Sequence, residues 1–310
     1  MRILRIWILM VLSVLATACS FSDEPPLCPY NARLDYWYSG GGDENELLLR
    51  VDHLTQYLYD SRGELLRVEE LRGDSVLHWR ADLPPGDYSV VTWGNLGTGA
   101  EASVVEEGPT ALKDMTLSAA RPDVPPGYRP NTERLYYATK AFTVEAGKVC
   151  RERVYVSHAH ARLNITVRWM ADFPGEGGVY RMRMGGIPAK YGFIREREIE
   201  SSSGSVHSVP WISSEQTRHE AKAAMNYEDE VQGELITYRF ENSTHELWSL
   251  WRDGERVVKE LDLQRFFDSL PMSLDENVEQ EFDLIITVWE DKITVALASS
   301  VDWVEGGAIG

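Results

Sequence analysis

Two histidines, His158 and His160, are separated by a single alanine in a segment that alternates like a β-strand. Side chains repeat every two residues along a strand, so both imidazoles lie on one face and could bind a metal ion together. No Asp, Glu or Cys flanks the pair at the spacing of a further ligand. The sequence therefore favours structural histidines, and it predicts neither a metal ion nor another cofactor.

Catalytic motifs are absent from the rest of the sequence. There is no Gly-x-Ser-x-Gly elbow, no glycine-rich phosphate loop and no His-Glu-x-x-His zinc motif. The carboxylates are abundant but unpatterned, which is typical of a solvated surface. The sequence thus predicts no catalytic residue and a protein that is not an enzyme, and a surface glycosidase or peptidase is the disfavoured alternative.

The tripeptide Arg72-Gly73-Asp74 is one that integrins recognise, which would suit a host-cell adhesin. It is also an ordinary Gly-Asp turn between two strands. The sequence alone favours the turn and leaves the adhesive use open.

Cys19 follows a positively charged start, a short apolar run and the small residues of Leu15-Ala16-Thr17-Ala18. This order indicates a secretory signal, and the apolar run is shorter than the ~20 residues of a membrane span. The pattern resembles the lipobox of bacterial lipoproteins, which implies removal of residues 1–18 and attachment of a diacylglycerol to Cys19. Two or three acyl chains would anchor the protein stably. The alternatives are an ordinary signal peptide or a single transmembrane helix with an incidental cysteine.

Residues 19–27 after the signal form a short polar, acidic, proline-bearing tether. The net charge is −18, and it becomes −20 without residues 1–18, which contain two arginines and no acidic residue. Such a surface does not bind nucleic acid or an anionic membrane through its charge. Contact with a membrane must therefore come from the lipid.

Cys28 and Cys150 remain after Cys19, and two cysteines in an oxidising compartment often pair. A disulfide between them would close a loop of about 120 residues and contribute about 4–5 kcal/mol in the chain-entropy model. The other possibility is that both stay buried as free thiols.

Short alternating strands separated by turns fill nearly all of the chain after Pro29, and they recur in two halves. The sequence predicts an all-β fold of two tandem β-sandwiches, residues 28–157 and 158–310. Further expectations are short strands at 135–138 and 142–144, irregular loops around 201–204 and Pro210, and helices at 215–225 and 261–270.

Three segments together resemble the FimB-type fimbrial anchor lipoproteins of Bacteroidales, and two further segments fit the family's second domain and its ending. The most specific is a proline-glycine turn, an apolar strand and a Trp-Gly-Asn stop. The segments are Cys28-Pro29, Tyr57–Glu64, Leu83–Asn95, Ala159–Val167 and Val301–Trp303.

The resemblance implies two transthyretin-like β-sandwich domains and a role as the lipid-held base of a fimbrium. Such a subunit tethers the fibre to the outer membrane at the cell surface and limits its length. The implied partners are the fimbrial shaft pilin, bound by β-strand addition, and the outer membrane, reached through the lipid. The alternative is a surface adhesin or fimbrial tip subunit that binds glycan or host protein. The glycine-rich tail Glu305–Gly310 is too short to look like a good donor strand.

Overall fold

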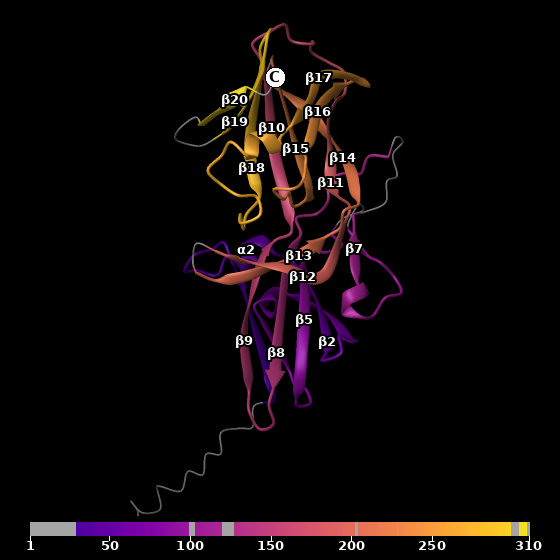
Figure 1. The fold of residues 1–310 in the computed structure, drawn as a ribbon, viewed down its shortest axis with the longest axis vertical. Helices are drawn as coiled ribbons and strands as arrows, with labels where there is room; N and C mark the ends of the chain where they lie inside the picture. The colour runs from indigo at the N-terminus through magenta and orange to yellow at the C-terminus, as the bar shows by residue number, and fades with distance from the viewer. Residues whose placement is uncertain are drawn as a thin grey trace, which may run out of the picture.

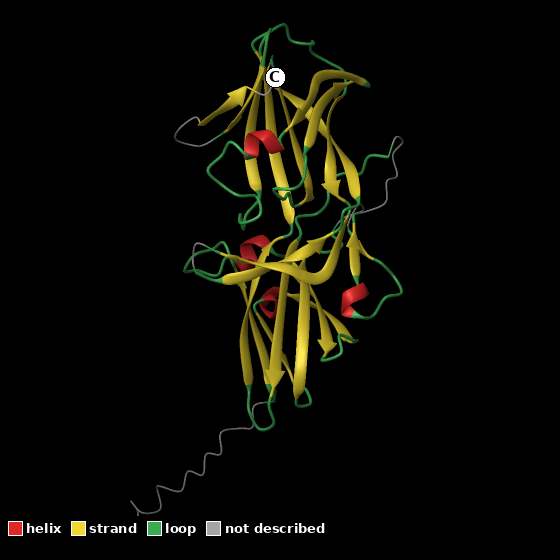
Figure 2. Cartoon of the chain, in the orientation of Figure 1, coloured by secondary structure: helices red, strands yellow, loops and turns green. Residues whose placement is uncertain are grey.

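The computed structural model of the protein describes residues 29–98, 103–119, 127–201, 204–227, 229–298 and 304–308. Two lobes, both built of strands, follow one another along the long axis (Figures 1 and 2). The described helices are single turns, α2 (Leu47–Arg50), α3 (Gln264–Phe267) and two 3-10 turns, η1 (Gly73–Val76) and η2 (Leu112–Asp114). None of the helices in these ranges is long and apolar enough to cross a membrane. The predicted all-β class is confirmed.

The lower lobe contains seven strands in the order β3-β2-β5-β8-β9-β1-β4. Burial alternates along the whole of β1, whereas β2, β5 and β8 bury one face in this lobe's own core and part of the other face in a second core. β8 and β9 pair only through Tyr136–His158 and Tyr137–Ser157, so the ribbon opens beyond these pairs and folds into two layers. The strands are β1 (Ala32–Tyr38), β2 (His53–Asp60), β3 (Leu65–Arg72), β4 (His78–Ala81), β5 (Gly86–Gly94), β8 (Tyr136–Val144) and β9 (Cys150–His158).

The upper lobe is one nine-stranded sheet in the order β17-β16-β11-β14-β15-β10-β18-β19-β20. Val258 on β17 and Val295 on β19 lie near opposite edges of this sheet and belong to one apolar core, which extends into the lower lobe. Phe266 and Phe267 of α3 pack into the same core. The strands are β10 (His160–Trp169), β11 (Tyr180–Pro188), β14 (Gln216–Tyr227), β15 (Glu230–Tyr238), β16 (Leu247–Arg252), β17 (Glu255–Asp262), β18 (Glu281–Val288), β19 (Ile293–Leu297) and β20 (Val304–Ala308).

A third sheet, in the order β13-β12-β7-β6, lies across the lower lobe (Figure 1). It contains β6 (Val104–Val105) and β7 (Thr116–Ser118) from the first half of the chain, and β12 (Lys190–Glu200) and β13 (Val206–Ile212) from the second. Tyr191 and Phe193 of β12 are fully buried against Trp93 of β5. The chain passes from lobe to lobe at 158–160, but β12 and β13 return to the lower lobe and interlock the two halves.

Several local predictions were wrong. Segment 215–225 lies in a strand, β14, because it hydrogen-bonds to β11 on one side and β15 on the other. Segment 261–270 contains only one helical turn, and the short strands at 135–138 and 142–144 belong to the continuous β8. Pro210 lies in β13 rather than in a loop, and β-bulges in β12 opposite it accommodate the missing backbone donor.

Candidate functional site at the junction of the lobes

The Trp-Gly-Asn stop ends β5 where the lobes meet. Trp93 is fully buried, and a Cβ on Gly94 would lie 3.0 Å from the Tyr136 side chain and 3.2 Å from that of Val51, so a larger residue would have to push these neighbours aside. The motif therefore closes the upper end of the lower lobe's core.

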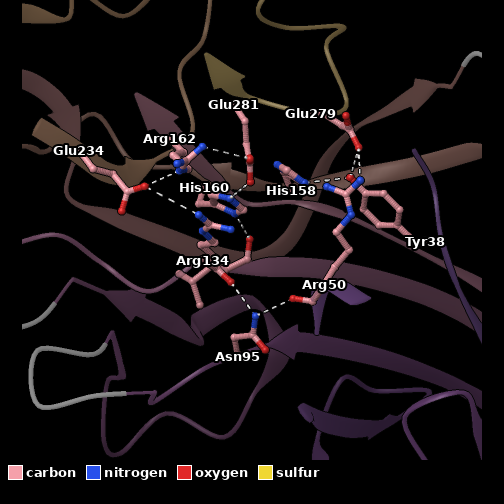
Figure 3. A network of polar contacts seen from close by, with 11 residues as sticks. Tyr38, Arg50, Asn95, Arg134, His158, His160, Arg162, Glu234, Glu279 and Glu281 are labelled. Carbon is pink, nitrogen blue, oxygen red and sulfur yellow. Dashed lines mark hydrogen bonds and ion pairs between the residues drawn. The ribbon is translucent and has the colours of Figure 1, made fainter. Parts of the chain in front are cut away.

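Asn95 follows with a φ of 59°, the left-handed conformation that asparagine tolerates better than most residues. Its side-chain amide donates to the carbonyls of Arg50 and Arg134 at 3.1 Å (Figure 3). Its Oδ1 accepts from the Asp52 backbone N–H at 2.9 Å. One side chain thus joins three loops beneath the junction.

His158 ends β9 and His160 begins β10, so the pair lies at the crossing between the lobes. Both side chains are fully buried, and their rings stack with centroids 4.4 Å apart and planes 19° from parallel. The His158 Nε2 lies 2.9 Å from the Tyr38 hydroxyl, and the His160 Nδ1 lies 2.8 Å from the Leu135 carbonyl oxygen (Figure 3). The structure confirms that the two imidazoles share one face.

Strand β18 runs parallel to β10 and pairs Glu281 with Arg162. This pairing brings the Glu281 side chain to the histidines. Its Oε1 lies 3.5 Å from the His160 Nε2, and its Oε2 lies 3.7 Å from Arg162. The sequence search for a third ligand missed Glu281, which follows His160 by about 120 residues. No local signal could have found it, because only the parallel pairing of distant strands brings it there.

A second acid, Glu279, accepts a hydrogen bond from the Tyr38 hydroxyl and lies 3.6 Å from Arg50. Arg162 also donates to Glu234, and Arg134 lies 3.8 Å from the same carboxylate. The junction is therefore a network of alternating charges around the histidine pair (Figure 3).

Burial and the neighbouring His160 and Arg50 hold the pKa of His158 well below its usual value, so His158 is neutral at pH 7. Within the described ranges, His158, His160 and Glu281 are the group of three that could hold a metal ion, with ligand atoms within 4.8 Å of one another.

Cys19 and Cys28 lie outside the described residues, so lipidation and disulfide pairing stay predictions. Cys150 is half-buried at the start of β9. Its backbone N–H donates to the Asn31 carbonyl at 2.8 Å.

The Arg72-Gly73-Asp74 tripeptide is exposed and runs from the end of β3 into η1. Gly73 has a φ of 57°, and the Ser75 hydroxyl accepts from the Arg72 backbone N–H and donates to its carbonyl. The motif is thus a capped surface turn, accessible from solvent.

The fold is shared with solved proteins of Bacteroidales. An adhesin candidate from Bacteroides thetaiotaomicron matches with a TM-score of 0.66 at 15% identity, covering 91% of this chain and 99% of that one. The fimbrial anchor protein Mfa2 from Porphyromonas gingivalis matches with a TM-score of 0.64 at 14% identity, covering 90% of this chain and 100% of that one. At such identities the likeness establishes a common fold.

The sequence profile of the fimbrillin-A associated anchor proteins Mfa1 and Mfa2 matches residues 24–298. The chain belongs to this family of fimbria-associated proteins, which is not a family of enzymes. The predicted resemblance to fimbrial anchor proteins is confirmed. No curated protein sequence matches the chain.

Proposed function

We propose that this protein is the base subunit of a fimbrium, held in the outer membrane by lipid on Cys19, and that it tethers the fibre and limits its length. The observation that carries the proposal is the family match over residues 24–298. Family membership supports a fimbrial role, and the lipobox-like sequence before Cys19 supplies the fixed end.

The positions of the chain ends support this role. Ala32 begins β1 beside Cys150, next to the β8–β9 turn at the outer end of the lower lobe, whereas β20, the last strand described, lies in the upper lobe (Figure 1). The ten residues 19–28 span at most about 36 Å when fully extended. The lower lobe would thus face the membrane and the upper lobe would face the fibre.

The sheet edges suggest where a pilin strand is added. The edge strands β3 and β17 are rich in charged residues, and the edge strand β13 contains Pro210. Charged residues and proline on an edge strand both oppose the addition of another strand. The edge strand β20 contains one charge, at Glu305, and no proline. We infer that the shaft pilin adds its strand at the β20 edge of the upper lobe, where main-chain hydrogen bonds supply affinity.

Deletion of the gene tests the anchoring role. We expect fibres to be released into the medium or to grow abnormally long, and we expect wild-type protein to restore them. A Cys19→Ala protein should leave the detergent phase and fail to retain fibres. Cell-attached fibres of normal length in the deletion strain would refute the proposal.

The proposed edge has its own test. A Gly306→Lys, Gly307→Lys protein places charges along β20, as β17 already has, and should lose co-purification with the shaft pilin. Val68→Lys, at an exposed position on the β3 edge, is the matched control and should retain it. Equal recovery of pilin with both proteins would exclude the β20 edge.

The exposed turn at Arg72-Gly73-Asp74 favours a second candidate function, an adhesin at the fibre tip. Immunogold labelling separates the two candidates. Label at the cell surface supports the base subunit, and label at the distal end of the fibre supports the tip subunit.

A further inference from the structure

The hydrogen bonds of His160 leave one of its ring nitrogens without a hydrogen-bond partner. The Leu135 carbonyl can only accept, so the His160 Nδ1 must carry the proton that it donates there. A neutral His160 therefore has a lone pair on Nε2, which is buried and has no hydrogen-bond partner. This lone pair lies 3.5 Å from an oxygen of Glu281, which is also an acceptor.

The hydrogen bonds of His158 have the same consequence. The Tyr38 hydroxyl donates its proton to Glu279, so the His158 Nε2–H must donate to the Tyr38 oxygen. The remaining lone pair is on Nδ1, which is also buried and without a hydrogen-bond partner. Each imidazole thus donates one N–H outward and keeps one bare acceptor.

This pattern is the one that zinc-binding histidines show. A ligating histidine donates its other N–H to a backbone carbonyl or to a carboxylate, and this bond fixes the tautomer and aims the ring. His160 has such a bond to a carbonyl, and His158 has one that reaches a carboxylate through Tyr38.

The arginines at the junction are directed mainly to the other two acids. Arg162 and Arg134 are directed to Glu234, and Arg50 lies beside Glu279. Glu281 has a longer contact, 3.7 Å, between its other oxygen and Arg162.

Distances between the acceptors fit a zinc ion. Two ligand atoms about 2.1 Å from a tetrahedral ion lie about 3.4 Å apart, and the His160 Nε2 and Glu281 Oε1 are separated by 3.5 Å. The ligand atoms of His158, His160 and Glu281 lie within 4.8 Å of one another, so shifts of these side chains bring all three around one ion. The Glu281 side chain is 27% exposed, which gives the ion a route from solvent.

We propose that His160, Glu281 and His158 form a binding site for a zinc-class divalent ion at the junction of the lobes. Two imidazole nitrogens and one carboxylate suit zinc, whereas calcium and magnesium prefer ligand sets made of oxygen alone. The ion would join β10 to β18 where the chain crosses between the lobes. This site is independent of the anchoring role.

Zinc titration of the chelator-treated protein against a chromophoric chelator tests the site. We expect one equivalent of zinc to bind, and we expect no displacement by calcium. Glu281→Gln, which keeps the shape of the side chain, should weaken this binding at least 10-fold. Tyr38→Phe removes the outer hydrogen bond and should weaken it about 10-fold, the usual effect of losing such a partner.

His245→Gln is the matched control, because His245 is exposed and lies 3.2 Å from Asp262, outside the cluster. Its affinity should equal that of the wild type. Circular dichroism of each variant establishes that it is folded. Failure of the wild-type protein to bind zinc, or equal affinity in Glu281→Gln, would overturn the proposal and leave a protonated His160 paired with Glu281.

Discussion

Replacing Phe193 by alanine tests whether the two halves of the chain are interlocked. Phe193 belongs to β12, from the second half, yet it is fully buried against the lower lobe. Its ring lies 5.0 Å from that of Tyr57 and 5.6 Å from that of Trp93. A buried Phe→Ala change costs about 3–5 kcal/mol, including about 0.5–1.5 kcal/mol for each aromatic pair. With two pairs lost, we expect a free energy of unfolding lower by about 4 kcal/mol.

Urea denaturation, followed by circular dichroism and by tryptophan fluorescence, measures this loss. Because Phe193 lies in a core shared by both lobes, both probes should report one transition moved to lower urea. Ile194→Ala, at the next position on β12, is the matched control. Its side chain is 45% exposed, and we expect a change below about 0.5 kcal/mol. A loss below about 1 kcal/mol in Phe193→Ala, or a lower-lobe transition that does not move, would refute the interlocking.

Three further predictions concern buried titratable groups and the cysteines. Burial lowers the pKa of His219 to about 4, so the unfolded state binds more protons than the folded state between about pH 6.5 and 4. The free energy of unfolding should therefore decrease by up to roughly 3 kcal/mol as the pH is lowered through this range. His219→Gln should flatten this slope in urea titrations at pH 7 and 5, and an unchanged slope would contradict the assignment. Burial raises the pKa of Glu246 to about 7. The stability that the protonated side chain provides at low pH is therefore lost as the pH rises from about 4.5 through 7. Glu246→Gln should therefore stabilise the protein at pH 8 and little at pH 4, and equal effects at both would count against this. The Cys150 backbone N–H donates to the carbonyl of Asn31, three residues after Cys28, so we expect a disulfide between Cys28 and Cys150. Its loss in Cys28→Ser should slow migration on non-reducing gels. Identical migration of the two proteins would exclude the disulfide.

Local pattern predicts the fold where a strand has one buried and one exposed face. β1 alternates along its whole length, and the structure places it at residues 32–38, as the alternation predicts. β14 was predicted to be a helix because its centre, Glu220–Met225, consists largely of good helix formers. Hydrogen bonding to β11 and β15 overrides that propensity.

The candidate site could be predicted only in part, for a similar reason. Spacing in the sequence places His158 and His160 on one face, and the structure agrees. Glu281 and Tyr38 join them through strand pairing and lobe contacts over about 120 residues each, which no local pattern encodes. The hairpin of β12 and β13 was missed because its bulges and Pro210 disrupt the two-residue period.

The parallel pairing of β1 with β9 has a mechanical consequence if the protein anchors a fibre. Seven residue pairs join these strands, from Ala32–Cys150 to Tyr38–Val156. Drag on the fibre would pull β9 upward through the upper lobe, while the tether would hold β1 down. The two strands would then be loaded in shear, so that all their hydrogen bonds resist together instead of opening one after another. A Cys28–Cys150 bond would add a covalent strap at the point where the force enters.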